Sequence, residues 1–150
     1  MTTHRETRRL PYSREQVYTL VADVAHYPEF LPWVVATRIK SDSETEMVAD
    51  MLVGFKHLRE KFTSLVHKHP VERIEVEYID GPLKNLENIW RFEEDGPDAC
   101  LIDFYVSFSF RNSLFESLAG QYFDRAFRKM VGAFEERAHQ LYGKSSSKAV

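Results

Sequence analysis

Cysteine is almost absent from this 150-residue chain, and long apolar runs are missing altogether. The single Cys100 excludes an internal disulfide bond and any zinc site that needs several cysteines. No apolar stretch approaches the length of a membrane-spanning helix, and the opening MTTHRETRRL lacks the apolar segment of a secretory signal peptide. A reducing compartment is compatible with these absences.

A large excess of one charge sign is also missing. Lys and Arg number 20 against 23 Asp and Glu, so the formal net charge is −3 at pH 7, and we expect no DNA partner. The hydrophobic share of 43% and the charged share of 29% are ordinary for a soluble globular domain. The length fits one domain, predicted over residues 1–143, with residues 144–150 predicted to form a disordered tail.

Motifs of catalysis are missing too. The sequence contains no GxSxG, P-loop, GxGxxG or HExxH pattern. His67 and His69 could bind a metal as a pair on a strand, but their neighbours favour a solvated turn at a strand end. Cys100 begins an apolar strand, which favours a buried thiol over a nucleophile, and Asp103 is interpreted as an ordinary surface acid. We therefore predict no catalytic residue, no metal and no cofactor.

The longest regular pattern in the chain is the proline-free stretch Ser113–Tyr142. Its apolar residues recur at helical spacing and its charged residues fill the opposite face, which predicts a long amphipathic helix. Gly120 and Gly132 interrupt it, and each costs about 1 kcal/mol relative to alanine. Two explanations stay open, namely plain close packing and the close approach of another segment to the helix backbone.

Upstream of this helix the pattern is mostly that of strands. An edge strand is predicted over Thr3–Leu10, followed by a short helix in which Ser13 and Gln16 form a capping box. Residues 25–34 contain Pro28 and Pro32, which exclude one continuous helix and predict a compact turn or a single helical turn. Six strands follow, predicted at Val35–Lys40, Met47–Gly54, Lys56–His67, Arg73–Asp80, Leu83–Glu93 and Cys100–Phe110.

This order of elements predicts an α+β fold. Short hairpin turns make sequential strands antiparallel neighbours, and a sheet with one apolar face needs a cover. We therefore expect a curved seven-stranded antiparallel sheet wrapped around the long C-terminal helix, with one or two short helices after the first strand. The abundant aromatic residues either fill a plain core or line an apolar tunnel between sheet and helix, and both alternatives stay open.

Several ordered segments match a known family over about Thr3–Gly143. They are Val17-Tyr18 through Asp23, Tyr27-Pro28-Glu29-Phe30-Leu31-Pro32-Trp33, Val53-Gly54-Phe55, Phe62-Thr63-Ser64, Asp80-Gly81-Pro82-Leu83-Lys84, Trp90-Arg91-Phe92, Gly120, Ala133-Phe134-Glu135-Glu136-Arg137-Ala138 and Leu141-Tyr142-Gly143. In these segments the chain resembles the coenzyme Q-binding START-like family. That family includes the bacterial ribosome-association toxin and lies within the polyketide cyclase/dehydrase and lipid-transport superfamily. Val34 departs from it where cysteine is frequent, and Leu83 stands where an aromatic residue is usual.

The resemblance implies a helix-grip (START/Bet v 1-like) fold and a hydrophobic cavity, with neither metal nor covalent cofactor. It implies a non-enzymatic binding protein or chaperone for ubiquinone (coenzyme Q) or a related polyisoprenoid lipid, which supports respiratory electron transport or quinone biosynthesis. The alternative is a ribosome-binding protein that blocks subunit joining, and a cyclase-type enzyme would need an acid or base inside the cavity. The expected location is cytoplasmic, with transient contact at the inner membrane surface as an addition.

The predicted ligand-binding residues fall into an entrance, a sheet wall and a helix wall. The entrance is predicted at Tyr27, Phe30, Leu31 and Trp33. The sheet wall is predicted at Phe62, Trp90, Phe104 and Phe108, and the helix wall at Leu118, Tyr122 and Phe123. These assignments depend on strand register, because a shift of one residue turns every side chain to the other face.

Overall fold

A computed structural model describes residues 2–143 of the chain, so the predicted disordered tail at 144–150 lies outside the described residues. The elements are β1 (Thr2–Leu10), α1 (Arg14–Ala22), the 3₁₀ helix η1 (Val24–Glu29), β2 (Val34–Asp42), β3 (Glu46–Phe55), β4 (Leu58–His69), β5 (Arg73–Asp80), β6 (Leu83–Glu94), β7 (Cys100–Phe110) and α2 (Ser113–Tyr142). The predicted α+β class and element order are confirmed, and the strand ends differ by a few residues.

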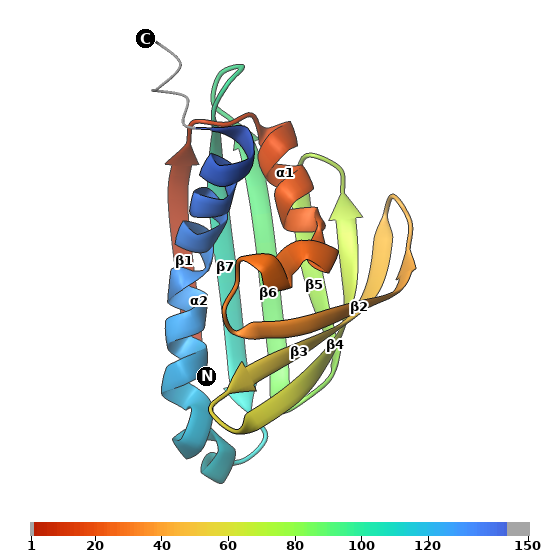
Figure 1. Cartoon of the computed structure of the whole chain (residues 1–150), viewed down its shortest axis with the longest axis vertical. Helices are drawn as coiled ribbons and strands as arrows, with labels where there is room; N and C mark the ends of the chain where they lie inside the picture. Colours follow the sequence, from red (N-terminus) through yellow and green to blue (C-terminus); the bar gives the residue numbers. More distant parts are fainter. Residues whose placement is uncertain (1, 144–150) are drawn as a thin grey trace.

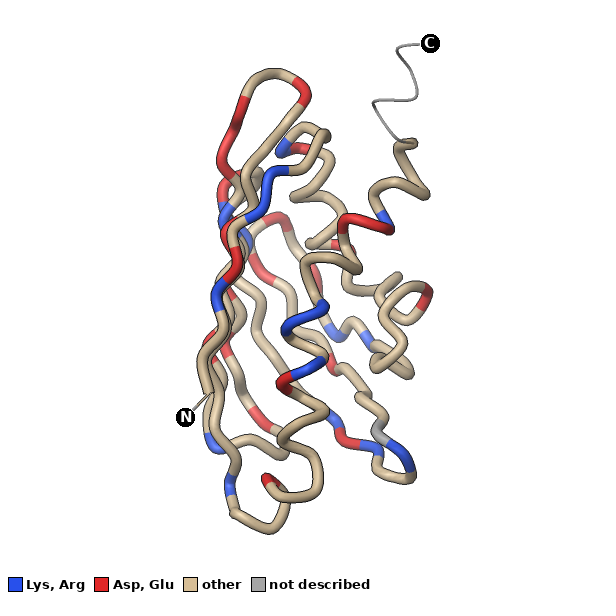
Figure 2. The backbone as a smooth tube through the Cα atoms, turned by 90° about the vertical axis from the view of Figure 1, so that its left-hand side faces the viewer, with Lys and Arg blue, Asp and Glu red and all other residues tan. Residues whose placement is uncertain are grey.

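The strands form a single seven-stranded antiparallel sheet in the order β1-β7-β6-β5-β4-β3-β2. Strands β2 to β7 are a meander, and β1 pairs with β7 to become an edge strand. All the helices lie on the same side of the sheet (Figure 2). Helix α2 runs beside β1 and β7, while α1 and η1 cover a different part of that side (Figure 1).

Local sequence explains where the helices begin. Ser13 accepts a hydrogen bond from the Gln16 backbone N–H at 3.2 Å, and the Gln16 side chain accepts from the Ser13 N–H at 3.1 Å, so the predicted capping box is confirmed. Asn112 caps α2 by accepting from the Phe115 N–H at 2.7 Å. Pro28 lies within η1, which is a short 3₁₀ helix rather than a continuation of α1.

The sheet is strongly curved, so α2 contacts strands that lie far apart in the strand order. At one edge of the sheet, Arg8 of β1 pairs with Glu135 of α2 at 2.8 Å. Far across the sheet, the Tyr122 hydroxyl of α2 donates to the Gly54 carbonyl oxygen of β3 at 2.7 Å. The sheet therefore grips the helix.

The two internal glycines of α2 have room for a side chain. A methyl group at Gly120 would lie 3.6 Å from its nearest neighbour atom, and one at Gly132 would lie 3.5 Å from the Arg8 guanidinium. Both distances are ordinary van der Waals contacts. No segment of residues 2–143 approaches the helix backbone closely enough to require glycine, so of the two explanations offered above, close approach is not supported.

Candidate ligand-binding cavity

An apolar cavity of about 140 Å³ lies between the sheet and α2. Four adjacent strands, β3 to β6, supply its sheet wall, and α1, η1 and α2 close it from the other side. The lining residues are Val21, Val24, Tyr27, Trp33, Ala49, Met51, Val53, Phe62, Ser64, Val66, Ile74, Val76, Leu86, Asn88, Trp90, Tyr122, Phe123, Ala126, Phe127, Met130 and Phe134. The curved sheet and the straight helix thus leave an unfilled space.

Each wall follows from the periodicity of its element. On β6, Leu86, Asn88 and Trp90 alternate with outward residues, and on β4 Phe62, Ser64 and Val66 do the same. On α2 the buried residues are Ala119, Phe123, Ala126, Val131, Phe134 and Ala138, whose spacing is that of one helix face. The cavity is therefore built from the inward faces of regular elements.

Part of the predicted ligand-binding set lines this cavity. Its members are Tyr27, Trp33, Phe62, Trp90, Tyr122 and Phe123. They come from η1, the segment before β2, β4, β6 and α2, so the fold brings together residues that lie far apart in the sequence. Ligand binding by these side chains stays a prediction.

The remaining predicted residues lie elsewhere. Phe104 and Phe108 of β7 are fully buried, but they pack against Trp90 and Phe127 with ring centroids 4.6 and 5.1 Å apart. The reason is that β7 lies beside α2 (Figure 1), and the Phe108 ring packs directly against the Phe127 ring of that helix. Leu118 is 57% exposed because it lies one residue before the buried position Ala119, about 100° around the helix. Placing these three residues on the cavity wall was wrong.

The entrance prediction is also corrected in part. Leu31 is buried in the core, with 1% of its surface exposed, and does not line the cavity. Phe30 stacks edge-on against Phe134 of α2 at 5.0 Å and lies under the Arg137 guanidinium at 5.1 Å. Tyr27 lines the cavity, and its hydroxyl donates to the Val21 carbonyl oxygen. Residues 27–33 thus anchor the cover of the cavity as well as lining it.

The residues that sequence reasoning missed are mainly small or aliphatic. Ala49, Met51 and Val53 alternate on β3, and Ile74 and Val76 alternate on β5. Within each strand these residues are two positions apart, so they point to the same face, and this alternation could have predicted the inward face. The alternation alone does not distinguish a filled core from a cavity. Ser64 and Asn88 carried a stronger signal, because each is a polar residue at an inward position between apolar ones.

The other candidate reactive groups lie outside the cavity. Cys100 is fully buried, and burial raises the pKa of its thiol to about 11, as expected for a structural cysteine. Asp103 forms a two-pronged ion pair with Arg5 at 3.1 and 2.8 Å on the outer face. The hydrogen bond from Arg5 lowers the pKa of the Asp103 carboxyl, so this residue is an ordinary paired acid.

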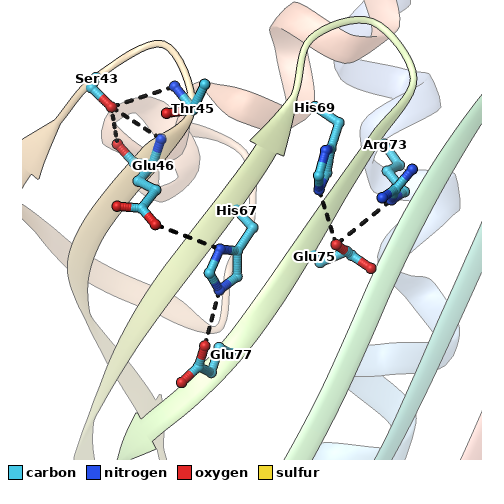
Figure 3. Close-up of polar contacts among 8 residues, drawn as sticks. All are labelled: Ser43, Thr45, Glu46, His67, His69, Arg73, Glu75 and Glu77. Atoms are coloured by element: carbon cyan, nitrogen blue, oxygen red, sulfur yellow. Dashed lines mark hydrogen bonds and ion pairs between the residues drawn. The ribbon is translucent and has the colours of Figure 1, made fainter.

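The two candidate metal-binding histidines lie near the end of β4, within the strand rather than in the turn that follows (Figure 3). His67 lies between two carboxylates, with Nε2 2.9 Å from Glu77 and Nδ1 3.8 Å from Glu46. His69 pairs with Glu75 at 3.0 Å. Among residues 2–143 no group of three or more His, Cys, Asp or Glu side chains has the arrangement of a metal site.

The curved sheet that grips a C-terminal helix defines a START-like helix-grip domain. The chain belongs to the polyketide cyclase / dehydrase and lipid transport family, whose sequence model matches residues 10–135. The family resemblance seen in the sequence is therefore confirmed. Within residues 2–143, no helix combines the length and apolarity that crossing a membrane requires.

Relatives with two different names are similar in sequence to this chain. The chain is 37% identical to coenzyme Q-binding protein COQ10 homolog B, mitochondrial, of Xenopus laevis, over 93% of this chain and 59% of that protein. It is also 37% identical to the ribosome association toxin RatA of Pseudomonas aeruginosa, over 95% of this chain and 100% of that protein. The chain thus spans less than two thirds of the Xenopus protein and the full length of the bacterial one.

Solved structures agree on the fold. An 18 kDa protein of Caulobacter crescentus is 38% identical and superimposes with a TM-score of 0.72 over 96% of this chain and 100% of that one. The Zhui aromatase/cyclase of Streptomyces sp. R1128 superimposes with a TM-score of 0.80 over 97% of each chain. At 14% identity, the second likeness concerns the fold alone.

Proposed function

We propose that this protein is a non-enzymatic binding protein or chaperone for ubiquinone or a related polyisoprenoid lipid, and that it supports respiratory electron transport or quinone biosynthesis. The observation that carries the proposal is the apolar cavity of about 140 Å³ between the sheet and α2. An engineered apolar cavity of about 150 Å³ binds benzene, so there is room here for one ring or one prenyl group. The name of the Xenopus laevis relative supports the same ligand class.

Burial provides the affinity. An isoprene unit has five carbons, and at about 0.8 kcal/mol per buried carbon it contributes about 4 kcal/mol. Association costs at least about 4 kcal/mol, so about three buried units reach micromolar affinity. Because the cavity holds only one ring or one unit, binding of a longer tail requires η1 or α2 to move outward.

The chemistry of the wall supports binding rather than catalysis. Among the described residues, the lining contains no Asp, Glu, His, Lys, Arg or Cys. Proton transfer and nucleophilic attack need such a group beside the substrate. Of the lining tyrosines, Tyr27 and Tyr122 donate their hydroxyls to backbone carbonyls, and burial raises the pKa of both phenols.

The test is to purify the protein, extract bound lipid for mass spectrometry, and titrate the lipid-free protein with a short-chain ubiquinone. Ala126→Leu fills the cavity from α2, and we expect it to weaken binding at least tenfold. Ala36→Leu is the matched control, because Ala36 is exposed on β2 and outside the cavity. A lipid-free protein that takes up no quinone would overturn the proposal.

A second candidate function is ribosome binding, which the full-length match to the ribosome association toxin of Pseudomonas aeruginosa favours. The exposed side of α2 carries Arg125, Arg128 and Lys129 at its middle, where Figure 2 shows a basic stretch. Arg128 is paired with Asp124 at 3.0 Å. Such a surface suits a phosphate backbone.

The two functions predict opposite sensitivities. Ribosome binding predicts co-sedimentation with ribosomal subunits that weakens with salt and with Arg125→Glu and Lys129→Glu, but not with Ala126→Leu. Quinone binding predicts that Ala126→Leu weakens the affinity for quinone and that the two charge reversals leave this affinity unchanged. Absence of co-sedimentation at low salt would eliminate the ribosomal function.

A further inference from the structure

Two small polar side chains interrupt the apolar sheet wall of the cavity. Ser64 lies on β4 and Asn88 on β6, each between apolar residues that also line the cavity. A hydroxyl or amide that faces an apolar space without a hydrogen bond is unfavourable by at least about 1 kcal/mol. Any N–H or O–H of these two side chains that has no hydrogen-bond partner in the wall can therefore gain from an acceptor inside the cavity.

Asn88 is held in one orientation. The Trp90 indole N–H donates to Asn88 Oδ1 at 3.2 Å, and Asn88 Nδ2 donates to the Tyr105 carbonyl oxygen at 2.9 Å. Because an indole only donates and a carbonyl oxygen only accepts, these two contacts fix which end of the amide is which. One N–H of the amide is left without a partner among residues 2–143.

Ser64 has more freedom. Its hydroxyl forms no hydrogen bond with any other group in the described part of the chain, and its neighbours across the strands are Ala49 and Tyr78. A serine hydroxyl can rotate to donate or to accept. Ser64 and Asn88 therefore each have one N–H or O–H available to an acceptor in the cavity.

The sheet sets the distance between these donors. Ser64 pairs with Tyr78 of β5, and Asn88 pairs with Val76 of the same strand, two residues away. With strands about 4.8 Å apart, the Cα atoms of Ser64 and Asn88 are roughly 12 Å apart. Both side chains stand on the same face of the sheet, so their donor atoms have a similar spacing, which is about that needed for a six-membered ring with oxygens at opposite positions and one hydrogen bond at each end.

We propose that Ser64 and Asn88 form a head-group subsite that binds the carbonyl oxygens of a quinone-type ring. The inference rests on the proposed lipid-binding function and deepens it, because it gives the cavity a preference for an oxygenated ring over an apolar group of similar size. Apolar walls bind an oxygenated ring and an apolar group of similar size equally well. The Ser64 and Asn88 donors add hydrogen bonds only to the ring that carries acceptor oxygens.

Calorimetric titration with two probes tests the subsite. The first probe is a ubiquinone with two isoprene units, and the second is geranylbenzene, which has the same tail on a ring without oxygens. We expect wild-type protein to bind the quinone about tenfold more tightly. Ser64→Ala and Asn88→Leu are each expected to weaken the quinone about fivefold and to leave geranylbenzene within about twofold. Val76→Ala, the apolar control between them, is expected to weaken both probes by the same factor.

The outcomes separate this inference from the proposed function. If wild-type protein binds both probes and neither polar variant discriminates between them, the subsite is overturned while lipid binding stands. If wild-type protein binds neither probe, lipid binding fails and the subsite falls with it. Asn88→Leu also removes the acceptor of the Trp90 N–H, so its thermal unfolding is measured first. Ser64→Ala breaks no hydrogen bond within residues 2–143, and it decides the matter if Asn88→Leu does not fold.

Discussion

Arg137 of α2 forms an ion pair with Glu29 at the end of η1, with Nη2 2.6 Å from Oε1. The same guanidinium lies over the Phe30 ring at 5.1 Å. Since η1 supplies Val24 and Tyr27 to the cavity, this contact ties the cover of the cavity to the helix wall. The cover of the cavity is thus held to α2 by a partly exposed ion pair.

Arg137→Ala is expected to loosen η1 without unfolding the sheet. It removes the ion pair and the contact with Phe30, together about 1–2 kcal/mol, so the Phe30 and Leu31 amides should exchange about 5- to 30-fold faster. Amide hydrogen exchange measures this. Arg128→Ala, which removes an exposed pair with Asp124, is the control and should leave both amides unchanged. If exchange of these amides were equally faster in both variants, Arg137 would not stabilise η1 specifically.

His26 should make stability depend on pH. Its Nδ1 forms a hydrogen bond with Asp23 at 2.8 Å. This hydrogen bond and the charges of Asp23 and Glu29 raise the pKa of the imidazole above its ordinary value of about 6.5. The positive charge of Arg137 opposes the shift. A raised pKa means that the folded state favours the protonated ring. The stabilisation is therefore complete below about pH 6.5 and is lost as pH rises through the folded-state pKa.

NMR titration of the imidazole checks this expectation. Asp23→Asn should lower the pKa of His26, and it should also flatten the fall in stability as the pH rises above about 6.5. Asp103→Asn changes a carboxylate that pairs with Arg5 instead, and it serves as the control. A pKa of His26 that is the same in wild-type protein and Asp23→Asn would contradict the assigned cause.

Periodicity and capping in the sequence were enough to predict the fold. The alternation in Cys100–Phe110 and the helical spacing in Ser113–Tyr142 gave both elements with their observed ends. Ser13 and Gln16 fixed the start of α1 through the capping box. These patterns depend on local sequence, so they can be recognised without knowledge of tertiary packing.

The cavity was only partly predictable, because its position depends on which strands α2 covers. Phe104 and Trp90 have the same inward alternation, yet only Trp90 lines the cavity, since β7 lies beside the helix and β6 lies farther from it. No pattern within one strand carries that information. Leu118 shows the same limit on α2, where the apolar stripe was broad enough that its buried centre could be misplaced by one residue.

Cys100 should be unreactive in the folded protein. Its side chain is fully buried, and burial raises the pKa of the thiol to about 11, so little thiolate is present at pH 8. An aromatic disulfide reagent should therefore modify it only on the timescale of unfolding, and at once in denaturant. Stoichiometric reaction within minutes under native conditions would contradict the buried position.

Removing the internal glycines of α2 should stabilise the protein. A methyl group at Gly120 would lie 3.6 Å from the Glu116 side chain and 3.9 Å from the Phe110 ring, and one at Gly132 would lie 3.5 Å from Arg8. With no steric conflict, alanine gains about 0.5–1 kcal/mol at each position from helix propensity. Urea unfolding of Gly120→Ala and Gly132→Ala should show midpoints above that of wild-type protein.

Gly81→Ala is the contrasting substitution, because that glycine has both a strained backbone and no space. Its φ is +154°, and a methyl group would lie 2.7 Å from the Tyr78 hydroxyl. That hydroxyl accepts from the Leu83 N–H at 2.9 Å and donates to the Leu83 carbonyl oxygen at 3.0 Å, so displacing it breaks the β5–β6 turn. We expect a loss of more than about 1 kcal/mol. If Gly81→Ala were tolerated while the helix substitutions destabilised the protein, the packing described for both places would be wrong.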